Sequence, residues 1–233
     1  MKVRPIALAL AATTLALTGA CLPYSVGSTA QTVRPGDKAT TNSYWIMPNG
    51  IALNEKDSTK ASTALFGFDR ETRWGIDSAS DFGLRVPSAS GLVASYKQRV
   101  SGYAHPDSAA VSWQLGGGVV NFAQHMELEA SLLTSSAKRG NIAWYGGARI
   151  VHTIPMSSGL KQDQPSIGAL IGARIGLAND DIMPEIAIYH DPSVTRIRSS
   201  NFIIVPSLSI KGTALNRVAR YVFGGRFGRL PPP

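Results

Sequence analysis

Apolar residues recur at every second position through most of this chain, which restricts it to β-sheet structure. Within 166–179, one face of such a strand carries Ile, Ala and Leu, whereas the other carries mainly Ser, Gly and Arg. The same alternation occurs in 141–153, 91–100 and 81–86. Further candidate strands cover about 38–47, 61–69, 109–117, 126–135, 182–190 and 201–211. A helix would instead repeat its apolar residues every third or fourth position, so we predict an all-β chain of about ten strands.

The polar face of these strands collects charges of both signs: Asp69, Arg85, Lys97, Arg99, Glu127, Glu129, Arg149, Arg174 and Glu185. In a transmembrane barrel the apolar face contacts lipid and the charges line the lumen. In a soluble barrel or sandwich the apolar face points inward and the charges contact water. Alternation alone fits both architectures.

Three further features favour the membrane barrel. The polar face is rich in Gly, which suits a crowded lumen better than a solvated surface. In membrane barrels the turns at one end are short and the loops at the other end are longer. The connections near 136–140 and 178–181 are short and those near 48–60, 154–165 and 191–200 are longer. The connection at 87–91 is an exception, because it is short but belongs to the end with the longer loops. Trp and Tyr residues lie mostly near strand ends or on the apolar face. We therefore predict an antiparallel up-and-down β-barrel over 38–211, transmembrane, with a lumenal polar network of Arg85, Lys97, Arg99, Glu127, Glu129, Arg149, Arg174 and Glu185.

The amino-terminal residues have the pattern of an export signal. Lys2 and Arg4 precede the apolar run Ile6–Leu17, which is too short to span a bilayer and is followed by small residues. We assign 1–20 to a signal peptide. Residues 21–37 are rich in Ser, Thr, Gly and Pro, which is typical of a flexible tether.

The end of the leader resembles a lipobox. The run Leu17-Thr18-Gly19-Ala20-Cys21 is similar to that of bacterial lipoproteins, in which signal peptidase II cuts before a Cys that is then acylated. The resemblance implies lipidation of Cys21, the only Cys in the chain, and Leu22 in place of Asp implies sorting to the outer membrane. The alternative is cleavage by signal peptidase I after Ser28-Thr29-Ala30, which would leave no lipid.

A second resemblance concerns the barrel itself. The segments Phe66–Ile76, Asp81–Pro87 and Gly91–Lys97 resemble hairpins of small bacterial outer-membrane β-barrel proteins. This implies location in the outer membrane of a Gram-negative bacterium and insertion by the barrel-insertion machinery. Such proteins tend to end on an aromatic strand, whereas this chain ends in Pro231-Pro232-Pro233. The basic tail 212–233 fits either a short amphipathic helix or a last strand.

Several classes of chemistry have no signature here. The four His residues lack ligand spacing, and neither a Gly-x-Ser-x-Gly turn nor a phosphate or dinucleotide loop occurs, so we expect no metal and no cofactor. Glu127 and Glu129 share a strand face, and we expect them to pair with Arg149 or Arg174 and not to catalyse a reaction. The net charge of +8 is spread along the chain and does not indicate nucleic acid.

The sequence thus predicts an outer-membrane β-barrel lipoprotein, not an enzyme, with a structural role or a role in limited solute passage. One alternative is a lipid-tethered soluble barrel that binds an apolar ligand, and a third is an acyl-modifying barrel enzyme. The expected partners are membrane lipid and the barrel-insertion and lipoprotein-sorting machinery. No protein partner is identified.

Overall fold

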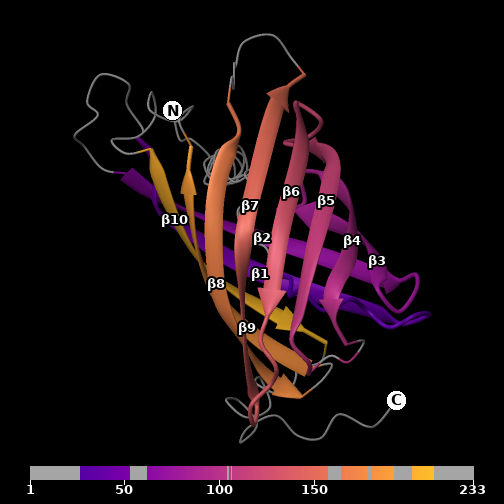
Figure 1. Cartoon of the computed structure of the whole chain (residues 1–233). Helices are drawn as coiled ribbons and strands as arrows, with labels where there is room; N and C mark the ends of the chain where they lie inside the picture. Colours follow the sequence, from indigo (N-terminus) through magenta and orange to yellow (C-terminus); the bar gives the residue numbers. More distant parts are fainter. Residues whose placement is uncertain are drawn as a thin grey trace, which may run out of the picture.

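The predicted all-β barrel is confirmed. The computed structural model describes residues 27–52, 62–103, 105, 107–156, 164–177, 180–191 and 201–212. In it, ten antiparallel strands form one closed barrel in which each strand pairs with its neighbours in sequence and the first pairs with the last (Figure 1). The strands are β1 (Lys38–Ala52), β2 (Ser62–Gly75), β3 (Ser80–Pro87), β4 (Leu92–Gly102), β5 (Ala110–Val120), β6 (His125–Ser135), β7 (Ile142–Pro155), β8 (Ser166–Leu177), β9 (Asp180–His190) and β10 (Phe202–Lys211). The proposed signal peptide, Cys21 and residues 213–233 lie outside the described residues.

The two ends of the barrel differ in their connections. We call the end at which β1 begins and β10 ends the terminal end, and the opposite end the loop end, which is at the top of Figure 1. The terminal end carries the connections 76–79, 103–109, 136–141 and 178–179, and the loop end carries the longer connections 53–61, 156–165 and 191–201. Two loop-end turns, 88–91 and 121–124, are short. Within the described residues, no helix has the length and apolar character needed to cross a membrane.

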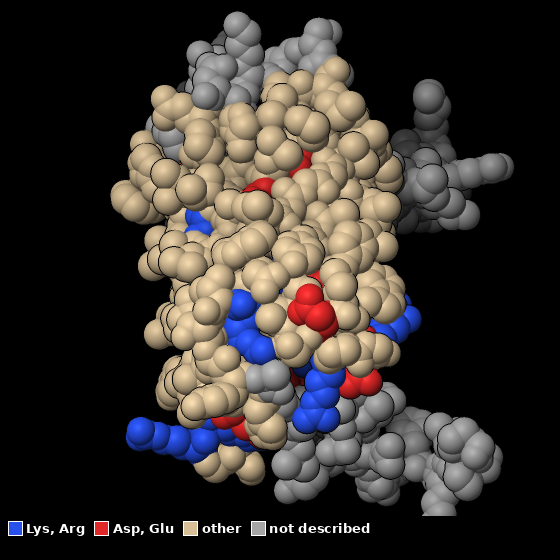
Figure 2. All heavy atoms as spheres, turned by 45° about the vertical axis from the view of Figure 1, so that its right-hand side comes forward, with Lys and Arg blue, Asp and Glu red and all other residues tan. Residues whose placement is uncertain are grey.

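The outer face of the barrel is apolar. Large side chains that point outward remain exposed, including Phe66 (68%), Leu132 (56%) and Ile171 (61%). Figure 2 shows the resulting broad uncharged surface, with Lys, Arg, Asp and Glu gathered toward the lower part of the view. Glu127 and Asp81, by contrast, point inward and are 0% exposed. This facing is opposite to that of a soluble barrel with an apolar interior.

Aromatic side chains mark both ends of the apolar surface. Near the terminal end, Trp74 stacks on Phe82 with ring centroids 6.3 Å apart, and the Lys38 ammonium lies 5.8 Å from the Trp74 ring. Near the loop end, His190 packs edge-on against Phe202 at 5.2 Å. Aromatic residues near both ends of the outer face are typical of barrels whose ends meet the two interfaces of a bilayer.

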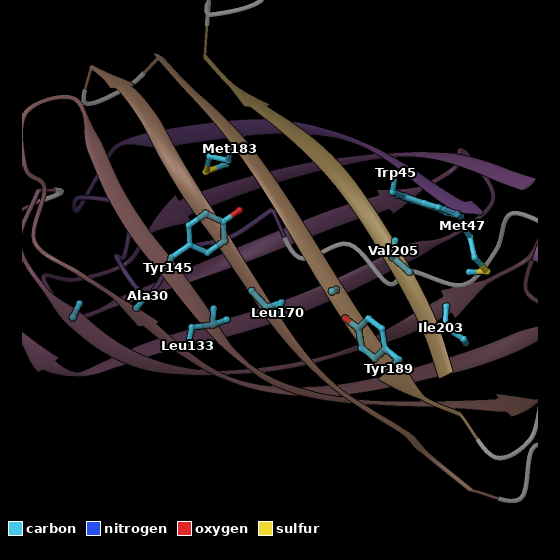
Figure 3. Close-up of a cluster of buried hydrophobic side chains, with 12 residues drawn as sticks. Ala30, Trp45, Met47, Leu133, Tyr145, Leu170, Met183, Tyr189, Ile203 and Val205 are labelled. Carbon is cyan, nitrogen blue, oxygen red and sulfur yellow. The ribbon is translucent and has the colours of Figure 1, made fainter. Parts of the chain in front are cut away.

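Large aromatic side chains also fill the lumen, and glycines make room for them. A Cβ on Gly67 would lie 1.9 Å from Trp45 Cζ2, and a Cβ on Gly168 would lie 2.3 Å from Tyr189 Cδ1. Tyr145 passes over the glycine at 172 in the same way. Figure 3 shows these three rings inside the barrel among buried aliphatic side chains. Gly on the inward face therefore permits close approach of a ring to the backbone.

The expected flexible tether is in part an element of the barrel. Residues 27–33, which we call the strap, lie inside the lumen, where Ala30 is 0% exposed. The strap reaches the terminal end through the exposed residues 34–37, and Gly75 N donates to Asp37 O there at 3.1 Å. The sequence predicted an external linker because Ser, Thr and Gly give the strap no apolar periodicity.

Candidate functional site

Four charged side chains meet in the middle of the lumen. Arg85 Nη2 on β3 donates to Glu127 Oε1 at 2.7 Å and to Glu129 Oε2 at 2.8 Å, both on β6. Arg149 on β7 donates from Nη2 to Glu129 Oε2 and lies 3.9 Å from Glu127 Oε1. We call these four residues the central cluster. The two-residue period of a strand places both carboxylates on the inner face, and the curvature of the sheet brings Arg85, three strands away on β3, within reach of them.

The central cluster is electrically balanced and shielded from solvent. Its four side chains are at most 7% exposed, and neutral groups extend it, since Gln114 Nε2 donates to Glu129 Oε1 at 3.3 Å. Buried charges are tolerated when they are paired and hydrogen-bonded, and removal of one partner leaves an uncompensated ion. Both carboxylates contact guanidinium groups, as expected for the structural pairing of Glu127 and Glu129.

A second group of ions lies nearer the terminal end. Arg73 on β2 donates from Nη1 to Glu71 Oε1 at 2.5 Å and from Nε to Asp81 Oδ1 at 2.7 Å. Lys97 Nζ on β4 lies 3.6 Å from Asp81 Oδ2. We call these four residues the terminal cluster. They are 8% exposed or less, so the terminal half of the lumen is also lined with paired charges.

Lys97 connects the terminal cluster to the strap. Its ammonium donates to Ser28 Oγ at 3.2 Å, to the carbonyl oxygen of Thr29 at 3.1 Å and to that of Gln31 at 2.8 Å. From the strap itself, Val33 N donates to Asp81 Oδ2 at 2.8 Å. The buried lysine therefore obtains from the strap the acceptors that water would otherwise provide.

The lumen toward the loop end contains both aliphatic and polar buried side chains. The aliphatic ones are Met47, Val93, Val120, Val151, Ile203 and Val205, and Ser166 and Asp191 are each 1% exposed at the same end. Val93 pairs with Arg85 and Val151 pairs with Glu129, so this part of the lumen adjoins the central cluster.

Seven of the eight residues predicted for the lumenal network are buried in the lumen: Arg85, Lys97, Glu127, Glu129, Arg149, Arg174 and Glu185. The structure divides them among separate groups. Arg174 does not reach the central cluster; its Nη2 donates to Asp107 Oδ1 at 2.5 Å, and its Nε lies 3.8 Å from Asp181 Oδ2. Glu185 accepts a hydrogen bond from Tyr145 at 3.1 Å.

Arg99 occupies a different place. It is only partly buried, at the rim of the terminal end, where its Nη1 donates to the carbonyl oxygen of Tyr103 at 2.9 Å and its Nη2 donates to that of Ser78. In the same turn, Asp77 accepts hydrogen bonds from the backbone N–H groups of Ala79 and Ser80, which hold its pKa below the usual range. These contacts brace a connection and are not part of the lumen.

Several ions that line the lumen were left out of the predicted network: Glu71, Arg73, Asp81, Asp181 and Lys211. The alternation could have found two of them, since Glu71 and Arg73 flank the outward Thr72 and the strand was predicted to end near 69, whereas β2 continues to Gly75. Within the described residues, no group of three or more His, Cys, Asp or Glu residues is placed to hold a metal ion.

Comparisons with known proteins identify relatives of the fold only. Neither a family model nor a curated protein matches this sequence. Among solved structures, the chain is similar to the outer membrane protein OprG from Pseudomonas aeruginosa, with a TM-score of 0.33 and 9% identity over 79% of this chain and 99% of that one. It is also similar to Ail, the attachment invasion locus protein of Yersinia pestis, with a TM-score of 0.29 and 10% identity over 76% and 96% of the two chains. A de novo designed transmembrane β-barrel matches with a TM-score of 0.31 and 13% identity over 78% and 100%.

Proposed function

We propose that this protein is a membrane-spanning β-barrel lipoprotein of the outer membrane of a Gram-negative bacterium, with a structural role. The observation that carries the proposal is the inverted facing of the sheet, with exposed Ile, Leu and Phe outside and paired ions inside. In water, such an apolar belt would far exceed the few hundred Å² that soluble monomers expose in one patch. In a bilayer the same belt contacts acyl chains, and a closed sheet satisfies its own backbone groups.

The filled lumen favours a structural role over solute passage. Apolar side chains, the central cluster and the strap succeed one another along the barrel, and no one sign of charge dominates. A small barrel with such an interior is a packed core and not a pore. Charges of both signs also give little ion selectivity.

A lipid on Cys21 is compatible with the position of the strap. Gly27 lies deep enough in the lumen that a Cβ on it would be 2.5 Å from the hydroxyl oxygens of Ser43 and Ser209. The five residues between Cys21 and Gly27 make six Cα-to-Cα steps, which span at most about 20 Å when extended, and Ser43 lies only about 16 Å along β1 from Lys38. The acylated residue can therefore reach the membrane surface at the terminal end.

Fractionation of the Cys21→Ser variant separates the barrel from its lipid. We expect the variant to stay in membranes washed with urea or carbonate and to keep heat-modifiable gel mobility, because the apolar belt holds it there without an acyl chain. Labelled palmitate should enter the parent and not the variant. Complete release of the variant would support the tethered soluble barrel instead, and a parent that takes up no palmitate would remove the lipid from the proposal.

Planar-bilayer recording tests the structural role. We expect the purified barrel to show no sustained conductance, because aliphatic side chains, the central cluster and the strap occupy the lumen. A steady ohmic current from the correctly folded barrel would restore the role in limited solute passage.

A further inference from the structure

The strap is the part of the lumen that does not belong to the wall. It precedes β1 in the chain, enters at the terminal end and occupies the space beside Lys97, Arg73 and Asp81. The wall behind it is complete, since all ten strands pair without it. The strap is therefore an occupant of a closed barrel and not one of its strands.

The contacts that hold the strap are polar and are made by both its main chain and its side chains. Lys97 Nζ binds the carbonyl oxygens of Thr29 and Gln31, and Ala30 N donates to Ser135 Oγ at 2.9 Å. The Gln31 side chain donates from Nε2 to the carbonyl oxygen of Ser108 at 2.5 Å and to Ser108 Oγ at 3.2 Å, and its Oε1 accepts from Arg99 Nη1 at 3.5 Å. Water can replace each of these contacts, and the strap buries little apolar surface. We therefore expect the strap to detach locally while the rest of the fold stays intact.

One residue of the strap fits its place only because it has no side chain. Gly27 has a φ of 53° and lies against the hydroxyl groups of Ser43 and Ser209. Gly36, at the exposed rim, has a φ of 78° but nothing within 4 Å of a Cβ. The two glycines have similar backbone conformations, and only the first is confined by the wall.

We propose that the strap is a displaceable plug, with one state in which it fills the terminal half of the lumen and another in which it leaves. Departure of the strap exposes a vestibule at the terminal end, lined by Arg73, Lys97, Arg174, Asp181 and Lys211. Asp181 is 0% exposed there, and its Oδ2 lies 3.8 Å from Arg174 Nε, so the vestibule has charges of both signs. The central cluster stays in place, so the vestibule has a floor and the barrel remains closed to passage. This inference adds regulated access to the barrel of the proposed function.

Thiol accessibility measures the two states. The full chain with Cys21→Ser and Ala30→Cys has a single thiol on the strap, at a position that is 0% exposed. We expect a bulky maleimide to label it slowly. Gly27→Val places a side chain against Ser43 and Ser209 and should accelerate labelling about tenfold or more. Lys97→Met removes the ammonium that binds the strap and should have an effect of the same size, since a hydrogen bond to a charged group contributes about that factor. Gly36→Val imposes the same backbone strain without a clash and should leave the rate unchanged.

Two outcomes would overturn the plug. Fast labelling in the parent would mean that the strap does not reside in the lumen. The strap would be a permanent part of the fold if the Cys at position 30 stayed protected from the maleimide in both variants while heat-modifiable mobility was kept. Loss of heat-modifiable mobility in both variants would lead to the same conclusion. Because labelling is measured on the detergent-solubilised barrel, it is independent of urea extraction, and failure of membrane spanning would be recognised separately.

Discussion

Replacement of Ile171 by Arg should destabilise the membrane-inserted barrel by about 2–4 kcal/mol, the cost of a lipid-facing cation near the bilayer midplane. Ile171 lies in the middle of β8, is 61% exposed and pairs across the sheet with the outward Ile186. A guanidinium at this depth reaches neither interface without deforming the bilayer. Reversible urea unfolding of the barrel in lipid vesicles measures the free energy directly.

The matched control places the same substitution at the end of the barrel. Ile76 is 57% exposed in the terminal-end turn, where Arg would reach water, so Ile76→Arg should cost about 0–1 kcal/mol. Equal effects at both positions, or unaltered assembly of the Ile171 variant, would contradict the assignment of the outer face to lipid.

Arg149→Met should destabilise the barrel by about 3–5 kcal/mol, because it leaves Glu129 and Glu127 with one cation in a buried site. Arg149 is 2% exposed and contacts both carboxylates. A second change, Glu129→Gln, restores the charge balance. The double variant should therefore be more stable than Arg149→Met alone, and urea unfolding of the four proteins in the cycle yields the coupling energy.

Arg70 provides the control for facing. It is exposed on the outer face of β2, between the inward Asp69 and Glu71. Arg70→Met removes a cation from the lipid-facing belt and should be neutral or stabilising. If the two Arg→Met substitutions had similar effects, the distinction between a charged lumen and an apolar exterior would be wrong.

The strands were predictable because alternation is a local property. In β7 and β8 the inward Arg149 and Arg174 could be assigned to one face from neighbouring residues alone. The alternation alone could not show which face points to lipid, since inversion of the sheet leaves the pattern unchanged. That choice needs the closed barrel, in which large apolar residues remain exposed.

The pairing of charges depended on geometry across the barrel. Arg174 has the same residue type and the same inward facing as Arg149, but its guanidinium contacts Asp107 and Asp181 near the terminal end. Arg85 takes the place beside Glu127, because the curvature of the sheet brings β3, three strands away, toward β6 across the lumen. The strap escaped prediction for a different reason: its contacts with Lys97, Asp81 and Ser135 are made through backbone atoms, which leave no signature in side-chain type.

Closure of the sheet also dictates an order of assembly. Nearest neighbours in sequence form every strand pair except the seam, where Thr41 pairs with Lys211 and Trp45 with Ser207. A chain halted at residue 191 would present two unpaired edges, on β1 and on β9, which are costly in lipid and prone to aggregation. The strap precedes β1 in the chain. Either β10 pairs with β1 while the strap is already inside the barrel, or the strap enters through the terminal end after the barrel has closed. Pairing of β10 with β1 therefore converts an open sheet with two unpaired edges into a closed barrel.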